Sequence, residues 1–125
     1  KKIEQDDKNF KFLEFTDNLA DEFLRADIAI IGEGNIKFET ALTGTPSILI
    51  TQFDHESGPI KHFISQETTI YAGRGDTLEK NTFLEILTEL IINKEKRVNL
   101  SKNGLKKFTP FGSQNLFQNH IKPFI

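Results

Sequence analysis

The feature that most constrains the fold of this chain is a pair of short, continuous apolar runs. Residues 27–31 are Asp-Ile-Ala-Ile-Ile, and residues 47–51 are Ser-Ile-Leu-Ile-Thr. Such runs are typical of strands buried on both faces, because neither face then has to be polar. Gly44 and Pro46, between the two runs, form a helix stop signal, since glycine accepts a positive φ and proline cannot continue a helix. The segment therefore predicts two parallel strands joined by a helix.

Weaker signals extend this alternation in both directions. Residues 11–15 alternate apolar and polar side chains as a strand does, and residues 69–72 predict a further strand. Residues 19–24 have apolar positions at helical spacing, and the side-chain oxygen of Thr16 or Asp17 is expected to cap that helix. Four strands alternating with helices predict an α/β fold, with a Rossmann-like parallel sheet and helices on both faces.

The second half of the chain is expected to be mainly helical. Phe83, Ile86, Leu87, Leu90 and Ile91 give the clearest amphipathic helix, preceded by a capping-box pattern at Asp76 and Glu79. Further helices are predicted near residues 60–64, 96–107 and 112–125, and a loop at 73–75. No repeat or internal linker divides the sequence. Residues 1–125 are therefore expected to form a single domain.

Composition excludes several classes of protein and site. The 125 residues carry a net charge of −2, which argues against a general nucleic-acid-binding protein. The absence of cysteine excludes disulfides and thiolate chemistry and fits a reducing compartment, so we expect a cytoplasmic location. No apolar run approaches the roughly 20 residues of a membrane span. The chain also lacks methionine, which is expected of a fragment of a larger protein.

Three loops are predicted to lie at the end of the sheet where ligands bind. In open α/β sheets that end is formed by the carboxyl ends of the strands, which selects residues 32–35, 52–58 and 73–76. Gly32 and Gly34 precede a helix whose free amides and dipole suit a phosphate, and glycine permits close approach of a ligand. A tight turn without a ligand explains this pattern equally well.

A dinucleotide site is the weaker competitor for the same loop. Its Gly-x-Gly-x-x-Gly pattern needs a small residue where this chain has Lys37, although Asp54 lies about 20 residues further on, where a ribose-binding acid is expected. An oxidoreductase domain therefore stays open as the less favoured alternative.

Four acidic or imidazole side chains are further candidates. Glu39 is expected to lie close to the core and the ligand loop, where it accepts hydrogen bonds from ribose hydroxyls; the alternative is a surface glutamate. Asp54, His55 and Glu56 could perform acid–base chemistry or form a solvated polar loop. With no second cluster of ligands, we predict neither a metal site nor a cofactor.

Residues 26–56 resemble a known family. They are similar to the C-terminal domain of glycosyltransferase family 28 in the GT-B superfamily, closest to the UDP-sugar hydrolase of pseudaminic-acid synthesis and its spore-coat polysaccharide relatives. The matching positions, in order, are Ala26, Asp27, Gly34, Glu39, Gly44, Pro46 and the strand at residues 48–50.

The resemblance implies the nucleotide-binding half of a glycosyltransferase or UDP-sugar hydrolase in bacterial surface-polysaccharide or nonulosonic-acid biosynthesis. It places Gly34 and Asn35 at the diphosphate of a UDP-type sugar nucleotide, Glu39 at the ribose, and His55 and Glu56 beside the sugar or diphosphate. The catalytic base of the hydrolase branch belongs to an N-terminal domain. The chain is therefore expected to need that domain or a partner chain and not to be catalytic alone.

Departures from the family pattern keep a second interpretation open. The usual Gly-Gly-Ser-Thr is replaced by residues 33–36, Glu-Gly-Asn-Ile, and the usual glutamine is Glu56. Two added carboxylates repel a diphosphate. The alternative is a non-catalytic module that is fused to, or assembles with, a sugar-activating enzyme such as a cytidylyltransferase. An unpaired sheet edge would also predict a homo-oligomer.

Overall fold

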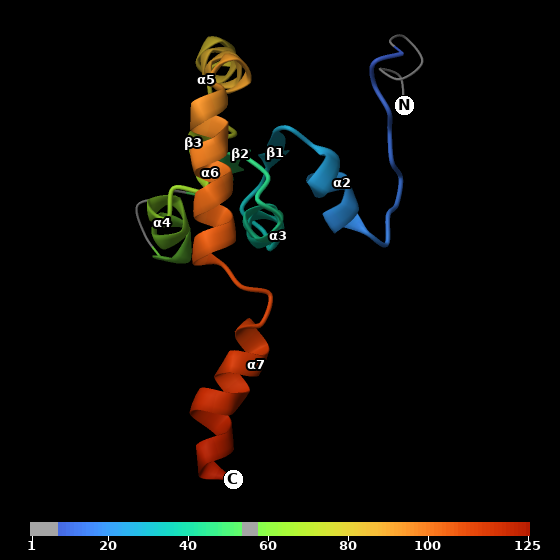
Figure 1. The fold of residues 1–125 in the computed structure, drawn as a ribbon. Helices are drawn as coiled ribbons and strands as arrows, with labels where there is room; N and C mark the ends of the chain where they lie inside the picture. Colours follow the sequence, from blue (N-terminus) through green and yellow to red (C-terminus); the bar gives the residue numbers. More distant parts are fainter. Residues whose placement is uncertain (1–7, 54–57) are drawn as a thin grey trace.

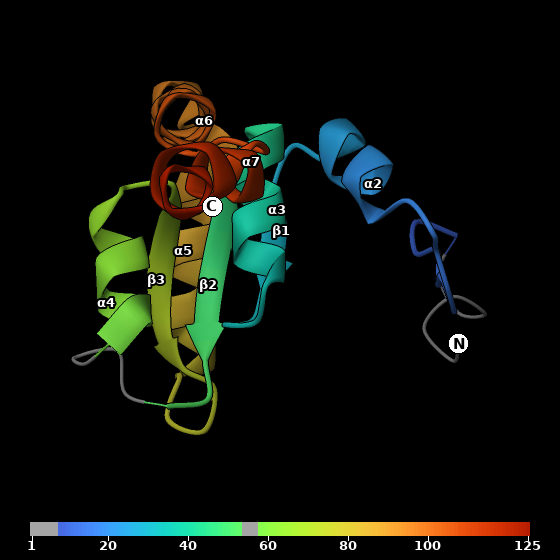
Figure 2. The same cartoon turned by 90° about the horizontal axis from the view of Figure 1, so that it is seen from below.

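The computed structural model describes residues 8–53 and 58–125 and contains a parallel three-stranded sheet (Figure 2). Its strands are β1 (Ala29–Ile31), β2 (Ser47–Thr51) and β3 (Thr69–Arg74), in the order β1-β2-β3. The predicted α/β class with a Rossmann-like parallel sheet is confirmed. The sheet has three strands rather than the four expected.

Helices connect and flank the strands (Figure 1). They are α2 (Leu19–Arg25), α3 (Ile36–Thr43), α4 (Gly58–Ser65), α5 (Lys80–Ile92), α6 (Lys94–Lys107) and α7 (Gly112–Leu116). A π-helical turn, η1 (Phe117–Ile121), and a 3-10 turn, η2 (Lys122–Phe124), continue α7 into a rod that extends away from the sheet (Figure 1). None of the helices described here has the length and apolar character needed to cross a membrane.

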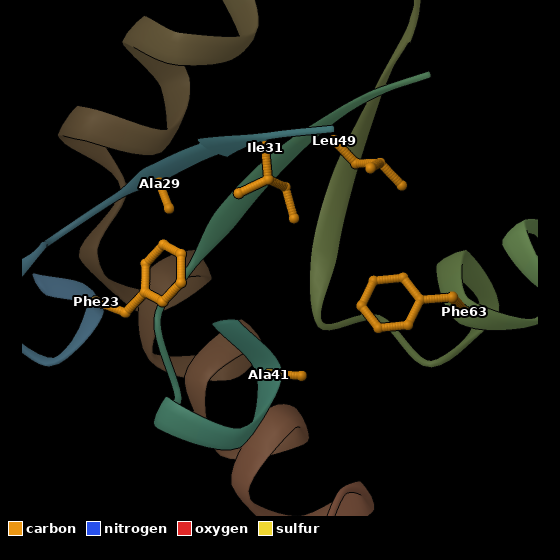
Figure 3. Close-up of a cluster of buried hydrophobic side chains, with 6 residues drawn as sticks. All are labelled: Phe23, Ala29, Ile31, Ala41, Leu49 and Phe63. Atoms are coloured by element: carbon orange, nitrogen blue, oxygen red, sulfur yellow. The ribbon is translucent and has the colours of Figure 1, made fainter. Parts of the chain in front are cut away.

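The core has one cluster on each face of the sheet, because alternate side chains of a strand point to opposite faces. Leu49 belongs to the first cluster, whose buried members also include Phe23, Ala29, Ile31, Ala41 and Phe63, from α2, β1, α3 and α4 (Figure 3). Ile48 belongs to the second cluster, with Leu90 of α5 and Leu100 of α6. The sheet is therefore covered on both faces, as predicted.

The prediction of a strand at residues 11–15 was wrong. These residues take an irregular course, and Phe12 and Phe15 are exposed. Alternating side chains favour a strand only when a neighbouring strand supplies hydrogen bonds and a core receives one face. Within the described residues, β1 pairs with β2 alone, so residues 11–15 have no such partner.

The expected loop at residues 73–75 is partly strand. The register between β2 and β3 shifts after Leu49, so that Ile50 lies opposite Gly73 rather than Ala72. Gly73 has a φ of 122°, a conformation that side chains rarely adopt. Beyond this bulge the pairing continues, with Thr51 opposite Arg74, so β3 ends at Arg74.

The capping residues also differ from those predicted. Helix α2 is capped by Asn18, whose side-chain oxygen accepts from the amide of Asp21, while Thr16 instead accepts from the amide of Asn18. Asp76 does not cap α5, because its carboxylate pairs with Arg74 and the helix begins four residues later, after Glu79. Short polar side chains compete for nearby donors, so sequence spacing alone did not identify the cap.

The contact between α3 and α6 is unusually close. A Cβ added to Gly104 of α6 would lie 2.5 Å from the carbonyl oxygen of Ala41 in α3. Gly44 ends α3 with a φ of 68°, as the sequence predicted, and faces Ser101 and Leu105 of α6. Helix α6 therefore holds the helix that follows the glycine turn at residues 32–35.

We predict that Gly104→Ala destabilises the protein by about 1–3 kcal/mol, because the added methyl forces α3 and α6 apart. Alanine usually stabilises a helix interior relative to glycine, so the loss would be specific to this contact. Urea unfolding measures it. Gly112→Ala is the matched control, because an added Cβ there meets no atom within 4 Å. A Gly104→Ala protein as stable as the unaltered chain would contradict the predicted clash.

Candidate functional site

A cleft of about 680 Å³ lies at the carboxyl ends of β1 and β2. It brings together parts of the three loops that the sequence singled out, with Gly32 and Gly34 from the first, Gln52 from the second and Gly75 from the third. The other lining residues are Ile30, Ile31, Glu33, Ile50 and Thr51. Among these described lining residues, Glu33 is the one with an ionisable side chain, so the cleft is better suited to binding than to acid–base chemistry.

The first loop has an open approach from solvent. A Cβ built on Gly32 or Gly34 would meet no atom within 4 Å, and neither residue has a positive φ. Neither packing nor backbone conformation therefore requires glycine at these positions. Asn35, the residue before α3, makes no side-chain capping bond, so the amides of the first helical turn are not capped by it. Both properties suit a ligand that approaches the backbone closely.

Hydrogen bonds at the end of β2 hold Phe53, at the described start of the second loop, and Gly75 of the third. The Thr51 hydroxyl donates to the carbonyl of Phe53 over 2.8 Å and lies 3.1 Å from the Tyr71 hydroxyl. The amide of Gly75 donates to the carbonyl of Thr51 over 2.9 Å. These bonds hold Gly75 beside the end of β2, and Gly75 and Gln52 line the same cleft as Gly32 and Gly34.

Lys37 does not line the cleft, but it contacts the glycine turn in a way that the sequence did not suggest. Its ammonium group donates to the carbonyls of Glu33 and Gly34 over 2.9 and 3.0 Å, and lies 4.3 Å from the ring centre of Phe38. Only 6% of the residue is exposed. From the sequence, Lys37 served only as an objection to the dinucleotide pattern. The side chain of a lysine three or four residues after a turn can fold back and donate to the carbonyl oxygens of that turn. This spacing is the sequence signal from which the contact could have been predicted.

Burial lowers the pKa of the Lys37 ammonium below its ordinary value, because a charged group loses solvation there. The carboxylate of Glu33 acts in the opposite direction and raises the pKa of Lys37. The negative charge of Glu33 in this turn therefore has a cation nearby.

The other predicted site residues have different outcomes. Glu39 is exposed and is not among the residues that line the cleft, so the expectation that it lies near the core was wrong. Lys37, Thr40 and Ala41 occupy the buried side of α3, and a residue two positions from Lys37 and Ala41 points away from it. A role for Glu39 toward ribose stays a prediction. Asp54, His55 and Glu56 lie outside the described residues.

Comparison with known proteins gives one distant relative. The chain is 25% identical over 95 residues to the spore coat polysaccharide biosynthesis protein SpsG of Bacillus subtilis. The match covers 76% of this chain and 28% of the relative, so the chain corresponds to less than a third of that protein's length. No family model and no solved structure matches the chain.

The lowered pKa of Lys37 predicts how stability depends on pH. Between the folded-state pKa and the ordinary lysine value of about 10.4, the unfolded chain binds more protons than the folded one. The free energy of unfolding is therefore expected to rise with pH through that window, relative to Lys37→Met, which cannot titrate. Urea unfolding of both proteins at a series of alkaline pH values measures the difference.

Lys80→Met is the control, because it makes the same substitution at an exposed lysine of α5. The quantity to follow is the free energy of unfolding of the unaltered chain minus that of Lys37→Met. The prediction would be contradicted if this difference fell or stayed constant as the pH rises toward about 10.4.

Proposed function

We propose that this chain acts in surface-polysaccharide biosynthesis, as the part of a larger protein that binds the nucleotide end of a UDP-type activated sugar. The observation that carries the proposal is the cleft at the carboxyl ends of β1 and β2, into which the turn at residues 32–35 opens before α3 begins. Ligands bind at this edge in open α/β sheets. The similarity to SpsG, whose description names polysaccharide biosynthesis, supports the biological setting.

The diphosphate, the ribose and the sugar each have a proposed partner in this chain. The diphosphate would lie against the amides of Gly34 and Asn35, where the positive end of the α3 dipole favours an anion. Glu39, one turn into α3, would accept from the ribose hydroxyls. Asp54, His55 and Glu56 would border the sugar or the diphosphate. The substrate's chemical transformation would need groups outside this chain, as the family resemblance implies for the glycosyltransferase or hydrolase reaction.

A titration of the 125-residue chain with UDP tests this proposal. A ligand that binds only the folded state raises the melting temperature, so we expect UDP at millimolar concentration to raise it. Glu39→Ala should weaken binding by about tenfold or more, because hydrogen bonds to a carboxylate are lost. Glu85→Ala is the control, since it removes the same exposed charge from α5.

Two results would oppose the proposal. UDP could leave the melting temperature unchanged, or Glu39→Ala could bind UDP as tightly as the unaltered chain does. A rise with NAD and none with UDP would instead favour the dinucleotide-binding alternative.

A non-catalytic module that assembles with a sugar-activating enzyme is the second candidate. It is favoured by Glu33, a residue that lines the cleft and whose negative charge would repel a diphosphate. The same titration separates the two candidates. Absence of any rise with UDP, UDP-N-acetylglucosamine, CMP or NAD would favour the module.

A further inference from the structure

The charges of this chain are distributed unevenly along its sequence. All 18 acidic residues precede position 96, so residues 96–125 contain no Asp or Glu. The same stretch contains six lysine or arginine residues, at positions 96, 97, 102, 106, 107 and 122. The net charge of −2 therefore conceals a basic segment at one end of the sequence, and such an asymmetry favours an anionic partner.

The structure places this basic segment at the end of the sheet opposite the cleft (Figure 2). Asn103 of α6 donates to the carbonyl of Glu67, just before β3 begins, over 2.9 Å. Ser101 of α6 lines a hollow together with Pro46, which directly precedes β2. Helix α6 therefore lies across the amino ends of the strands, whereas the cleft lies at their carboxyl ends. A partner bound along α6 would leave the cleft open.

Most cations of the basic segment have no carboxylate partner within the described part of the chain. Lys96 pairs with Glu89 over 2.7 Å. Lys102, Lys106 and Lys122 are exposed, and none of them forms an ion pair with a residue that the structure describes. Lys102 and Lys106 are also one helical turn apart, so they lie on the same side of α6. Free cations grouped in this way are attracted to a negatively charged surface.

The rod formed by α7, η1 and η2 adds an apolar face to the basic segment (Figure 1). Phe117, Ile121 and Phe124 follow one another at i, i+4 and i+7, which is the spacing of one side of a helix. Their exposed fractions are 43%, 44% and 86%. No residue from 109 to 125 is buried. A helix this short is marginally stable in water by itself, so a partner that buries its apolar face would stabilise it.

Free cations beside exposed aromatic rings distinguish between the possible partners. A nucleic acid offers phosphates, but its backbone provides no apolar layer for Ile121 and the phenylalanines. A second copy paired through the same surface would bring two acid-free segments together, and their like charges would repel. A bilayer with acidic phospholipids offers both requirements, because anionic headgroups lie directly above an apolar region.

We propose that residues 94–125 form an interface for the surface of a membrane that contains acidic phospholipids. The free lysines of α6 and the rod contact the headgroups, and Phe117, Ile121 and Phe124 enter the boundary between headgroups and acyl chains of one leaflet. The inference goes beyond the proposed function, because it concerns the opposite end of the sheet and holds whichever ligand the cleft binds.

Flotation of the 125-residue chain with two kinds of lipid vesicle tests the interface. The chain should bind vesicles of mixed phosphatidylcholine and phosphatidylglycerol but not vesicles of phosphatidylcholine alone, and added salt should weaken the binding. Lys102→Glu combined with Lys106→Glu should weaken it about tenfold or more, since two attractive charges become repulsive. Lys61→Glu combined with Lys80→Glu is the matched control at exposed lysines of α4 and α5, and should retain the binding.

A fluorescence measurement tests the role of the apolar face. The chain contains no tryptophan, so Phe117→Trp introduces a single indole into the rod. Its emission should move to shorter wavelength when phosphatidylglycerol vesicles are added, because the ring leaves water. Phe15→Trp is the matched control, at an exposed phenylalanine outside the basic segment, and its emission should not move. Both positions are exposed, so neither substitution alters the packing of the core.

The inference would be overturned if the chain floated with neither kind of vesicle, if the variant with Glu at 102 and 106 bound as tightly as the unaltered chain, or if the Phe117→Trp emission stayed constant in the bound state. A short-wavelength emission without vesicles, together with a dimeric mass, would instead assign the apolar face to a second copy. Binding to duplex DNA as tight as binding to vesicles, and unchanged by Phe124→Ser, would assign the segment to nucleic acid.

Discussion

Ile48 and Leu49 point to opposite faces of the central strand β2, and neither exposes any of its surface. Burial of such a side chain contributes about 1.5–3 kcal/mol, but only if elements cover both faces of the sheet. This requirement places α3 and α4 on one face and α5 on the other (Figure 2). The strands are parallel, so their carboxyl ends, and the loops that follow them, lie at the same end of the sheet.

The sequence was sufficient to predict the elements that local pattern and burial both support. The bounds of β2 were predicted residue for residue, and Gly44 ends α3 as expected. The errors arose where a local signal depended on a distant partner. Residues 11–15 have the alternation of a strand but no neighbour to pair with, and the bulge opposite Gly73 depends on the register between two strands, which no single segment encodes.

The candidate site was predictable to a similar extent and for similar reasons. The rule that ligands bind at the carboxyl ends of strands selected the glycine turn and the loop containing Gly75, and both border the cleft. Side-chain direction was not predictable in the same way. Glu39 was predicted to lie on the buried side of α3, but it lies on the exposed side. Lys37 was considered only for its size. Its contacts could not be predicted, because the path of a long flexible side chain depends on which carbonyl groups and aromatic rings surround it.

The close contact between Ala41 and Gly104 has a consequence for how the protein is made. The helix that follows the glycine turn packs against the sheet and also against α6, a helix much later in the chain. Contacts between sequence-distant segments form late, since the loop between them must close first. During synthesis, a chain that has emerged only as far as β3 therefore lacks the helix that packs behind the glycine turn, so the surroundings of the cleft are complete only after α6 has emerged.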